Sequence, residues 1–118
     1  MYGLPPGLDL SFFRGRTLIQ VCVGSNDSSF NFDDGLTISV TSAIGYMDSE
    51  NVYRRYEDFR QAVTHVVALL DRVVSSARGT TDGTLSIEFQ NGARLDIFDN
   101  SPQYESYVIR YGDRLIVV

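Results

Sequence analysis

The sequence predicts an α+β fold: an antiparallel sheet of six to eight strands, built from two β-meander repeats, with one helix packed on its apolar face. Three observations support this prediction. Residues 30–40 and 87–97 align without a gap, and both alternate apolar and polar side chains around an Asp-Gly or Asn-Gly pair. The stretch between them carries an apolar stripe at helical spacing. The whole chain, residues 1–118, has the length of a single domain.

Composition and charge limit what this chain can bind. Hydrophobic residues make up 43% and charged residues 21% of the 118 residues, a balance typical of globular proteins. The net charge is −5 and all ten basic residues are arginine, whereas a nucleic-acid-binding domain needs a basic patch against phosphate. No apolar run approaches the roughly 18 residues of a membrane helix, and residues 1–7 lack signal-peptide features. We therefore expect a cytoplasmic protein that binds neither nucleic acid nor membrane.

The first repeat half, residues 16–44, is predicted to form a three-stranded meander. An apolar stretch from Thr17 ends at Gly24, and alternation then continues on both sides of Asp34–Gly35. That pair favours a type I′ turn, because both residues tolerate positive φ. Neighbouring side chains of a strand point to opposite faces. The expected buried face comprises Ile19, Val21, Val23, Phe30, Phe32, Leu36, Ile38 and Val40.

Residues 50–70 are predicted to form the helix that covers the apolar face. Asp48 or Ser49 is expected to cap its start. His65, the only histidine, falls on the opposite side of the helix, so we expect it at the surface rather than in a catalytic site. The apolar stripe comprises Val52, Tyr56, Phe59, Val63, Val66, Val67 and Leu70.

The second repeat half, residues 72–98, shows the same pattern with Asn91–Gly92 at its turn. Its first strand matches less well, because Ser76 and Arg78 are polar where the first half has valine. A duplication and two independent hairpins that share the most favourable turn both remain open. The expected buried face comprises Val74, Leu85, Ile87, Phe89, Leu95 and Ile97.

The chain is expected to end in one or two closing strands within residues 103–118. Its last four residues, Leu115–Val118, are all apolar. An exposed apolar tail would be prone to association, so this segment must be packed or must pair with a second copy.

Nothing in the sequence resembles a catalytic or metal-binding motif. Cys22 lies in a predicted strand without a basic neighbour to activate it, and a lone cysteine excludes a disulfide framework or a multi-cysteine zinc site. Asp33–Asp34–Gly35 lacks the ligand spacing of an EF-hand. We therefore expect no catalytic residue, no cofactor and no metal. An enzyme that uses carboxylates on the polar sheet face is the least favoured alternative.

Tyrosine and acidic residues are the more suggestive surface candidates. Tyrosine offers a large, rigid contact area with a polar tip and is enriched in binding sites. We expect Tyr104, Glu105 and Tyr107 to contact a partner, followed by Asp33 and Asp34. The alternative is that Tyr56 and Tyr107 are ordinary residues at the edge of the core.

The sequence resembles a family of small bacterial domains of unknown function, common in actinobacteria and proteobacteria. The resemblance covers the chain from about Leu10 and rests on the Phe32–Gly35 hairpin, the second Asp/Asn-Gly hairpin and the Tyr104–Ile109 segment. It implies no active site, so no catalytic residue is carried over. In size and style the chain is also similar to the immunity proteins encoded beside bacterial polymorphic toxins.

These observations favour a non-enzymatic interaction protein. The favoured hypothesis is an immunity-like acidic inhibitor that binds a protein partner, with a basic toxin among the candidates, because opposite charge speeds association. The alternative is a homodimeric structural or small-ligand-binding module without catalysis, in which an edge strand pairs across a twofold axis.

Overall fold

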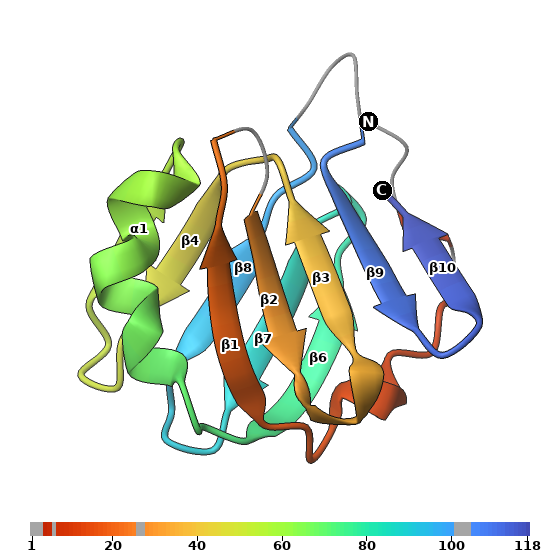
Figure 1. The fold of residues 1–118 in the computed structure, drawn as a ribbon, viewed down its shortest axis with the longest axis horizontal. Coiled ribbons are helices and arrows are strands. Elements are labelled where there is room, and N and C mark those ends of the chain that lie inside the picture. The colour runs from red at the N-terminus through yellow and green to blue at the C-terminus, as the bar shows by residue number, and fades with distance from the viewer. Residues whose placement is uncertain (1–3, 6, 26–27, 101–104) are drawn as a thin grey trace.

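The computed structural model describes residues 4–5, 7–25, 28–100 and 105–118, and contains two five-stranded antiparallel sheets that lie face to face (Figure 1). The first sheet has the order β1 (Leu18–Val23), β2 (Ser28–Phe32), β3 (Thr37–Val40), β9 (Tyr107–Tyr111) and β10 (Arg114–Val117). The second has the order β5 (Tyr53–Tyr56), β4 (Ile44–Met47), β8 (Arg94–Ile97), β7 (Leu85–Phe89) and β6 (Val74–Gly79).

The fold is α+β and mostly sheet, but the expected single sheet of six to eight strands is wrong. Each sheet buries one face, and the two buried faces cover each other. No helix is therefore needed across the apolar face. The core between the sheets includes Phe30, Ile38, Ile87, Leu95 and Ile97, all fully buried.

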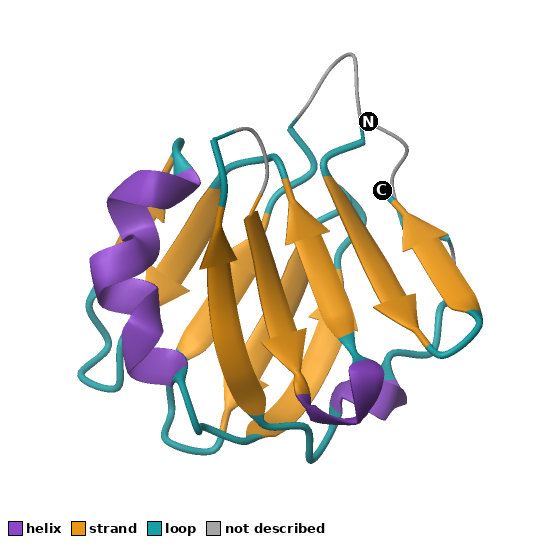
Figure 2. Ribbon diagram, viewed as in Figure 1, coloured by secondary structure: helices purple, strands orange, loops and turns teal. Residues whose placement is uncertain are grey.

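The helix is shorter than predicted and lies elsewhere. α1 (Phe59–Val66) runs along the open side between β1 and the β4–β5 hairpin, and buries Phe59, Ala62 and Val66 (Figure 2). A 3-10 turn, η3 (Val67–Leu69), continues it. The cap is Asp58, whose carboxylate accepts the Arg60 N–H at 3.0 Å, rather than the expected Asp48 or Ser49.

Residues 53–56 form a strand because they lie opposite β4 in an antiparallel hairpin. The Asp48 carboxylate accepts the N–H groups of Glu50 and Val52, and Asn51 has a φ of 67°. These contacts close the turn that sends the chain back along β4. The prediction of a helix over this segment rested on the spacing of Val52 and Tyr56. In the structure, Val52 belongs to the turn and Tyr56 to the strand.

Both predicted meanders are present. β1–β2–β3 pair in order in the first sheet and β6–β7–β8 in the second. Each meander has a bulge at the same place in its first strand, after Leu18 and after Val74. The hairpin that follows each meander then joins the opposite sheet, since β4 pairs with β8 and β9 pairs with β3. Each sheet therefore contains strands from both halves.

The two halves correspond in detail around one point. Thr17 and Val73 form an isolated antiparallel bridge. Around it, the Leu18 N–H donates to the Arg72 carbonyl at 3.1 Å, and the Val74 N–H donates to the Arg16 carbonyl at 2.8 Å. Each half thus donates from the residue after the bridge and accepts at the residue before it. A local twofold axis through the bridge would relate the two hydrogen bonds in this way. Common descent of the halves remains a prediction that this geometry supports.

The same correspondence reaches upstream of the strands. The 3-10 turn η1 (Ser11–Phe13) precedes β1 as η3 precedes β6. In the first, the Arg16 N–H donates to the Phe13 carbonyl; in the second, the Arg72 N–H donates to the Leu69 carbonyl. Phe13 and Leu69 are both fully buried. The similarity thus extends beyond the hairpins from which the repeat was predicted.

The bulge in β1 changes the predicted buried face. Leu18 points inward, and the extra residue moves Ile19 to the surface, where 55% of it is exposed. Val23, also predicted to be buried, is exposed near the strand end. In the second half the whole predicted set is buried as expected.

The first hairpin turn has the positive φ at both central residues that the type I′ prediction requires, whereas the second does not. Phe32 and Leu36 flank a three-residue turn, η2 (Asp33–Gly35), in which both Asp34 and Gly35 have positive φ. In the second hairpin, Gly92 has a φ of 91° and Asn91 does not have a positive φ. The extra residue in each turn shifts the pairing by one position relative to a two-residue loop.

Candidate interaction surface

The predicted contact residues do not form one cluster. Asp33 and Asp34 lie in the turn before β3, whereas Glu105 lies just before β9, beside the other end of β3. The Thr41 hydroxyl donates to the Glu105 carbonyl at 2.8 Å, which fixes the latter position. Glu105 is exposed. Tyr104 lies outside the described residues.

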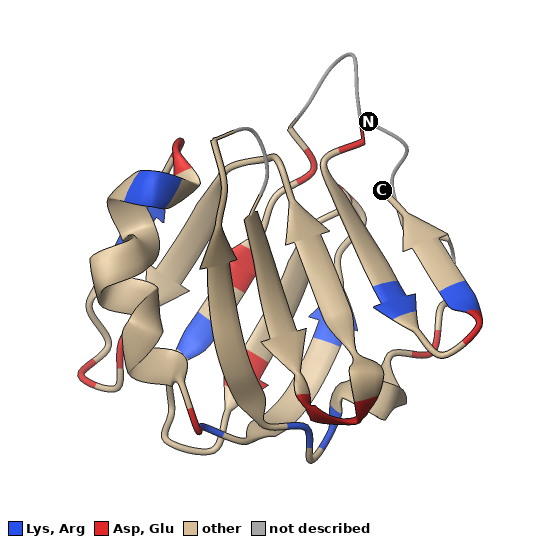
Figure 3. Cartoon of the chain, in the orientation of Figure 1, with Lys and Arg blue, Asp and Glu red and all other residues tan. Residues whose placement is uncertain are grey.

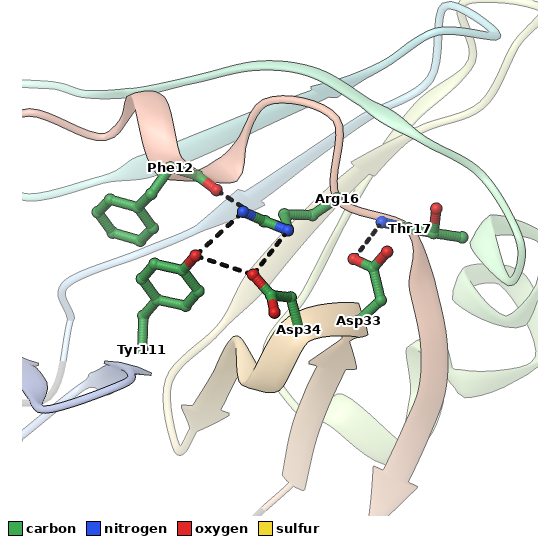
Figure 4. Close-up of polar contacts among 6 residues, drawn as sticks. All are labelled: Phe12, Arg16, Thr17, Asp33, Asp34 and Tyr111. Atoms are coloured by element: carbon green, nitrogen blue, oxygen red, sulfur yellow. Dashed lines mark hydrogen bonds and ion pairs between the residues drawn. The ribbon is translucent and has the colours of Figure 1, made fainter.

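Asp33 and Asp34 make contacts within the fold (Figure 4). The Asp33 carboxylate accepts the Thr17 N–H at 3.0 Å. Asp34 pairs with Arg16 at 3.0 Å and accepts the Tyr111 hydroxyl at 3.0 Å. Arg16 also donates to the Tyr111 hydroxyl, so three side chains from the start of β1, the turn and the end of β9 form a closed triangle.

This triangle attaches the N-terminal segment to the first sheet. The Phe12 ring stacks on Tyr111 with a centroid separation of 5.2 Å, and the Arg16 Nε donates to the Phe12 carbonyl. The Arg114 guanidinium lies over the Phe12 ring, 5.0 Å from its centroid. The charge of Asp34 is balanced locally by Arg16, so this end of the sheet presents little net negative charge.

Tyr107 is part of the core. Only 1% of it is exposed, and its hydroxyl donates to the Gly83 carbonyl at 2.7 Å. Burial raises the pKa of the Tyr107 hydroxyl. Nearby, the Ser106 hydroxyl donates to the buried Asp99 carboxylate at 2.8 Å. A ring inside the core has no surface to offer a partner, which corrects the expectation for Tyr107.

Acidic side chains collect at the end of the molecule where Glu105 lies. The loops there join β1 to β2, β3 to β4, β5 to α1, β6 to β7 and β8 to β9. Their described residues include no arginine, and in Figure 3 these upper loops carry acidic segments and no basic one. We call this surface the acidic end; its carboxylates belong to Glu57, Asp58, Asp82, Asp99 and Glu105.

The opposite end of the molecule is mixed in charge. The described loops there carry carboxylates such as Asp48, Asp71 and Asp113, but also Arg14, Arg16 and Arg72. The described loops of the two ends therefore differ in composition, because arginine occurs in those of this end and not in those of the acidic end.

A polar groove of about 340 Å³ opens at the acidic end. Its walls are the loop after β1, the loop after β3 and the start of α1, and they include Ser25, Thr41, Glu57 and Asp58. The Asp58 carboxylate pairs with Arg60 at 2.9 Å, which lowers the pKa of that carboxyl and keeps it ionised. Arg60 also lines the groove, so the ion pair with Asp58 lies at its rim, and Glu57 there pairs with Arg55 at 2.9 Å.

The outer face of the second sheet holds a polar cluster around Asp96, to which β5 adds Tyr53. Asp96 is buried there; it accepts the Ser86 hydroxyl and the Tyr53 hydroxyl, the latter at 3.1 Å. Arg94 forms an ion pair with Asp96, with Nε 3.3 Å from Oδ1. The Tyr53 ring lies over Gly45, where a Cβ would be 2.0 Å from the tyrosine oxygen. The ring covers the carboxylate, so Asp96 is a structural link rather than an accessible group.

His65 and Cys22, the two residues with the most reactive side-chain types, lie outside the candidate surface. His65 is exposed on α1, and its ring stacks on Tyr56 at 5.6 Å. The Cys22 thiol is half-buried beside Asn31 on the outer face of the first sheet. Within the described ranges, no three His, Cys, Asp or Glu side chains are grouped as metal ligands, and no helix there is long and apolar enough to cross a membrane.

Comparison of the sequence with known protein families gives a match. Residues 10–118 match the model of a family of unknown function, DUF6188. The chain belongs to this family. DUF6188 thus covers both meanders, α1 and the closing hairpin of the structure described above. No curated protein and no solved structure matches the chain.

Proposed function

We propose that this member of DUF6188 is a non-catalytic interaction protein that binds a basic protein partner through its acidic end, as an immunity-type inhibitor of a basic toxin would. The observation that carries the proposal is the composition of the loops: those described at the acidic end hold carboxylates and no arginine. Two of these carboxylates, on Glu57 and Asp58, pair with Arg55 and Arg60 of the flanking strand and helix, so the remaining carboxylates contribute most of the charge that a partner would meet. An acidic surface accelerates encounter with a basic protein and favours complementary pairing.

Three exposed carboxylates are the contact residues of this proposal. Glu105, predicted from the sequence, is joined by Asp82 in the loop after β6 and by Glu57 at the groove, whose exposed carboxylate a partner's basic group would share with Arg55. Asp58 and Asp99 also lie at the acidic end, but the first caps α1 and the second is buried with Ser106. Their main contribution is to the local field and to the fold.

The proposal is tested by capture of partners from the lysate of a toxin-bearing bacterium. We expect one stoichiometric basic protein whose capture weakens as salt rises, because screening shortens the reach of the acidic field. A variant with Glu57→Gln, Asp82→Asn and Glu105→Gln should lose it. Capture of an acidic partner, or capture unaffected by salt, would contradict the proposal.

The control variant removes the same charge from the opposite end. Glu50→Gln, Asp71→Asn and Asp113→Asn change exposed residues in loops of that end. Capture by this variant should match that of the wild type. Equal loss in both variants would indicate a response to total charge rather than a binding surface.

A further inference from the structure

We infer that two copies of this chain associate by antiparallel pairing of their β10 strands, with Leu115 of one copy opposite Val117 of the other. This inference concerns the edge of the first sheet and is independent of the acidic end. It rests on three features of β10: its place in the sheet, its exposed side chains and the direction of its backbone groups.

β10 differs from the other three edge strands. α1 packs beside β1. The Leu4 side chain lies against the β6 edge at Gly79, 2.4 Å from where a Cβ would stand. β5 carries Arg54 and Arg55, and charged edge strands resist pairing with another chain. Among the strands that the structure describes, β10 has β9 as its one neighbour, and it carries apolar residues after Arg114.

Two large apolar side chains are exposed on β10. Leu115 is 56% exposed and Val117 is 38% exposed, whereas Ile116 and Val118 are buried. Val117 lies opposite Val108 of β9, so the apolar surface continues onto the neighbouring strand. Leaving these side chains in water forgoes the free energy that burial against an apolar partner would provide.

The backbone of β10 is aligned for a further strand. The N–H of Val118 donates to the Tyr107 carbonyl at 2.9 Å, and the Tyr107 N–H points back to the Val118 carbonyl. Antiparallel residue pairs alternate between hydrogen-bonded and non-bonded. The next bonded pair is therefore Ile116 with Ile109, and the N–H and C=O groups of Leu115 and Val117 point away from β9.

These features fit a second copy of the same strand. Twofold antiparallel pairing centred on Ile116 places Leu115 opposite Val117 twice, so each outward pair of backbone groups meets an identical outward pair. The four apolar side chains then lie together on one face, because paired residues share a face of the sheet. The two first sheets would form one continuous sheet through β10.

The test is sedimentation velocity, which measures the mass of the protein in solution. Protein concentrations from about 1 to 500 μM span the range in which a weak dimer would form. We expect the wild type to change from 13.2 kDa to twice that mass. Leu115→Lys should raise the dimer Kd by about a hundredfold or more, because it places an ammonium in the apolar cluster. A wild type that stays monomeric throughout would overturn the inference.

Two further variants separate strand pairing from nonspecific apolar association. Val117→Pro keeps an apolar side chain but removes an outward N–H that makes no bond to β9, and an edge strand tolerates proline there. It should therefore be monomeric with a melting temperature close to that of wild type. Ile19→Lys removes an equally exposed apolar residue from β1, on the other edge of the same sheet, and should still dimerise. Dimerisation of Val117→Pro, or loss in Ile19→Lys, would contradict pairing through β10.

Discussion

The substitution Tyr107→Phe separates a structural from a binding role of this residue. It removes only the hydroxyl, which donates to the Gly83 carbonyl at 2.7 Å inside the core. A buried hydrogen bond contributes about 0.5–1.5 kcal/mol net, and an unsatisfied buried acceptor adds to the loss. We therefore expect a loss of about 1–2 kcal/mol, or a fall in melting temperature of about 4–8 °C for a domain of this size. Partner affinity should not change.

Tyr111→Phe is the matched control, because it makes the same chemical change on the same strand. Its hydroxyl contacts Asp34 and Arg16 in partly exposed surroundings, where such contacts contribute about 0–1 kcal/mol. Chemical denaturation of both variants should therefore rank Tyr107→Phe as the more destabilised. Equal stability of the two variants would refute the structural role assigned to the Tyr107 hydroxyl.

The same pair of proteins gives a pH test with a defined sign. In the unfolded chain Tyr107 loses its proton near pH 10, while burial raises the pKa of Tyr107 in the folded chain. The folded state then binds more protons above pH 10, so its stability falls with rising pH by about 1.4 kcal/mol per unit. The advantage of wild type over Tyr107→Phe should accordingly shrink between pH 10 and 11. A constant or growing advantage would contradict the assigned burial of the hydroxyl.

Three further predictions concern other contacts. Gly45→Ala should destabilise the chain by about 1–2 kcal/mol, because its Cβ must displace the Tyr53 ring; urea unfolding in a Tyr53→Ala background should show no such cost. Asp58→Ala should cost about 1 kcal/mol through loss of the α1 cap, and loss of helical circular dichroism at a lower temperature would show it. Asp34→Asn should cost less than about 1 kcal/mol, an effect that high salt should reduce because the pair with Arg16 is exposed.

The sequence predicts the strands better than their arrangement. Alternation around Asp34–Gly35 and Asn91–Gly92 identified both meanders, since strand side chains repeat every second residue. The same alternation cannot indicate which sheet a hairpin joins. The crossing of β4–β5 to the second meander and of β9–β10 to the first depends on long-range pairing, which leaves no local pattern.

Local exceptions account for the remaining differences. The bulge after Leu18 shifted Ile19 to the surface, and no residue in β1 marks the bulge. Strand β5 was assigned to a helix because Val52 and Tyr56 happen to fit a helical stripe, although tyrosine and β-branched residues also favour strands. The choice of Tyr107 as a contact residue over the core-edge alternative fails because a tyrosine that satisfies its hydroxyl inside a core has the same sequence signature as an exposed one.

The candidate surface was anticipated only in part. The excess of acidic residues and the choice of Glu105 came from the sequence, whereas the fold alone brings Glu57 and Asp82 to the same end of the molecule as Glu105. Asp33 and Asp34 were chosen for their charge, but the start of β1 supplies the Thr17 N–H and the Arg16 guanidinium that engage them.

The most direct test of the proposed function compares the two charge-neutralised variants against the purified partner. Association rates are measured for wild type, for Glu57→Gln with Asp82→Asn and Glu105→Gln, and for the control with Glu50→Gln, Asp71→Asn and Asp113→Asn, across a range of salt concentrations. We predict that only the first variant associates at least tenfold more slowly at low salt, with a flatter salt dependence. Equal rates for the two variants would contradict the assignment of the acidic end as the binding surface.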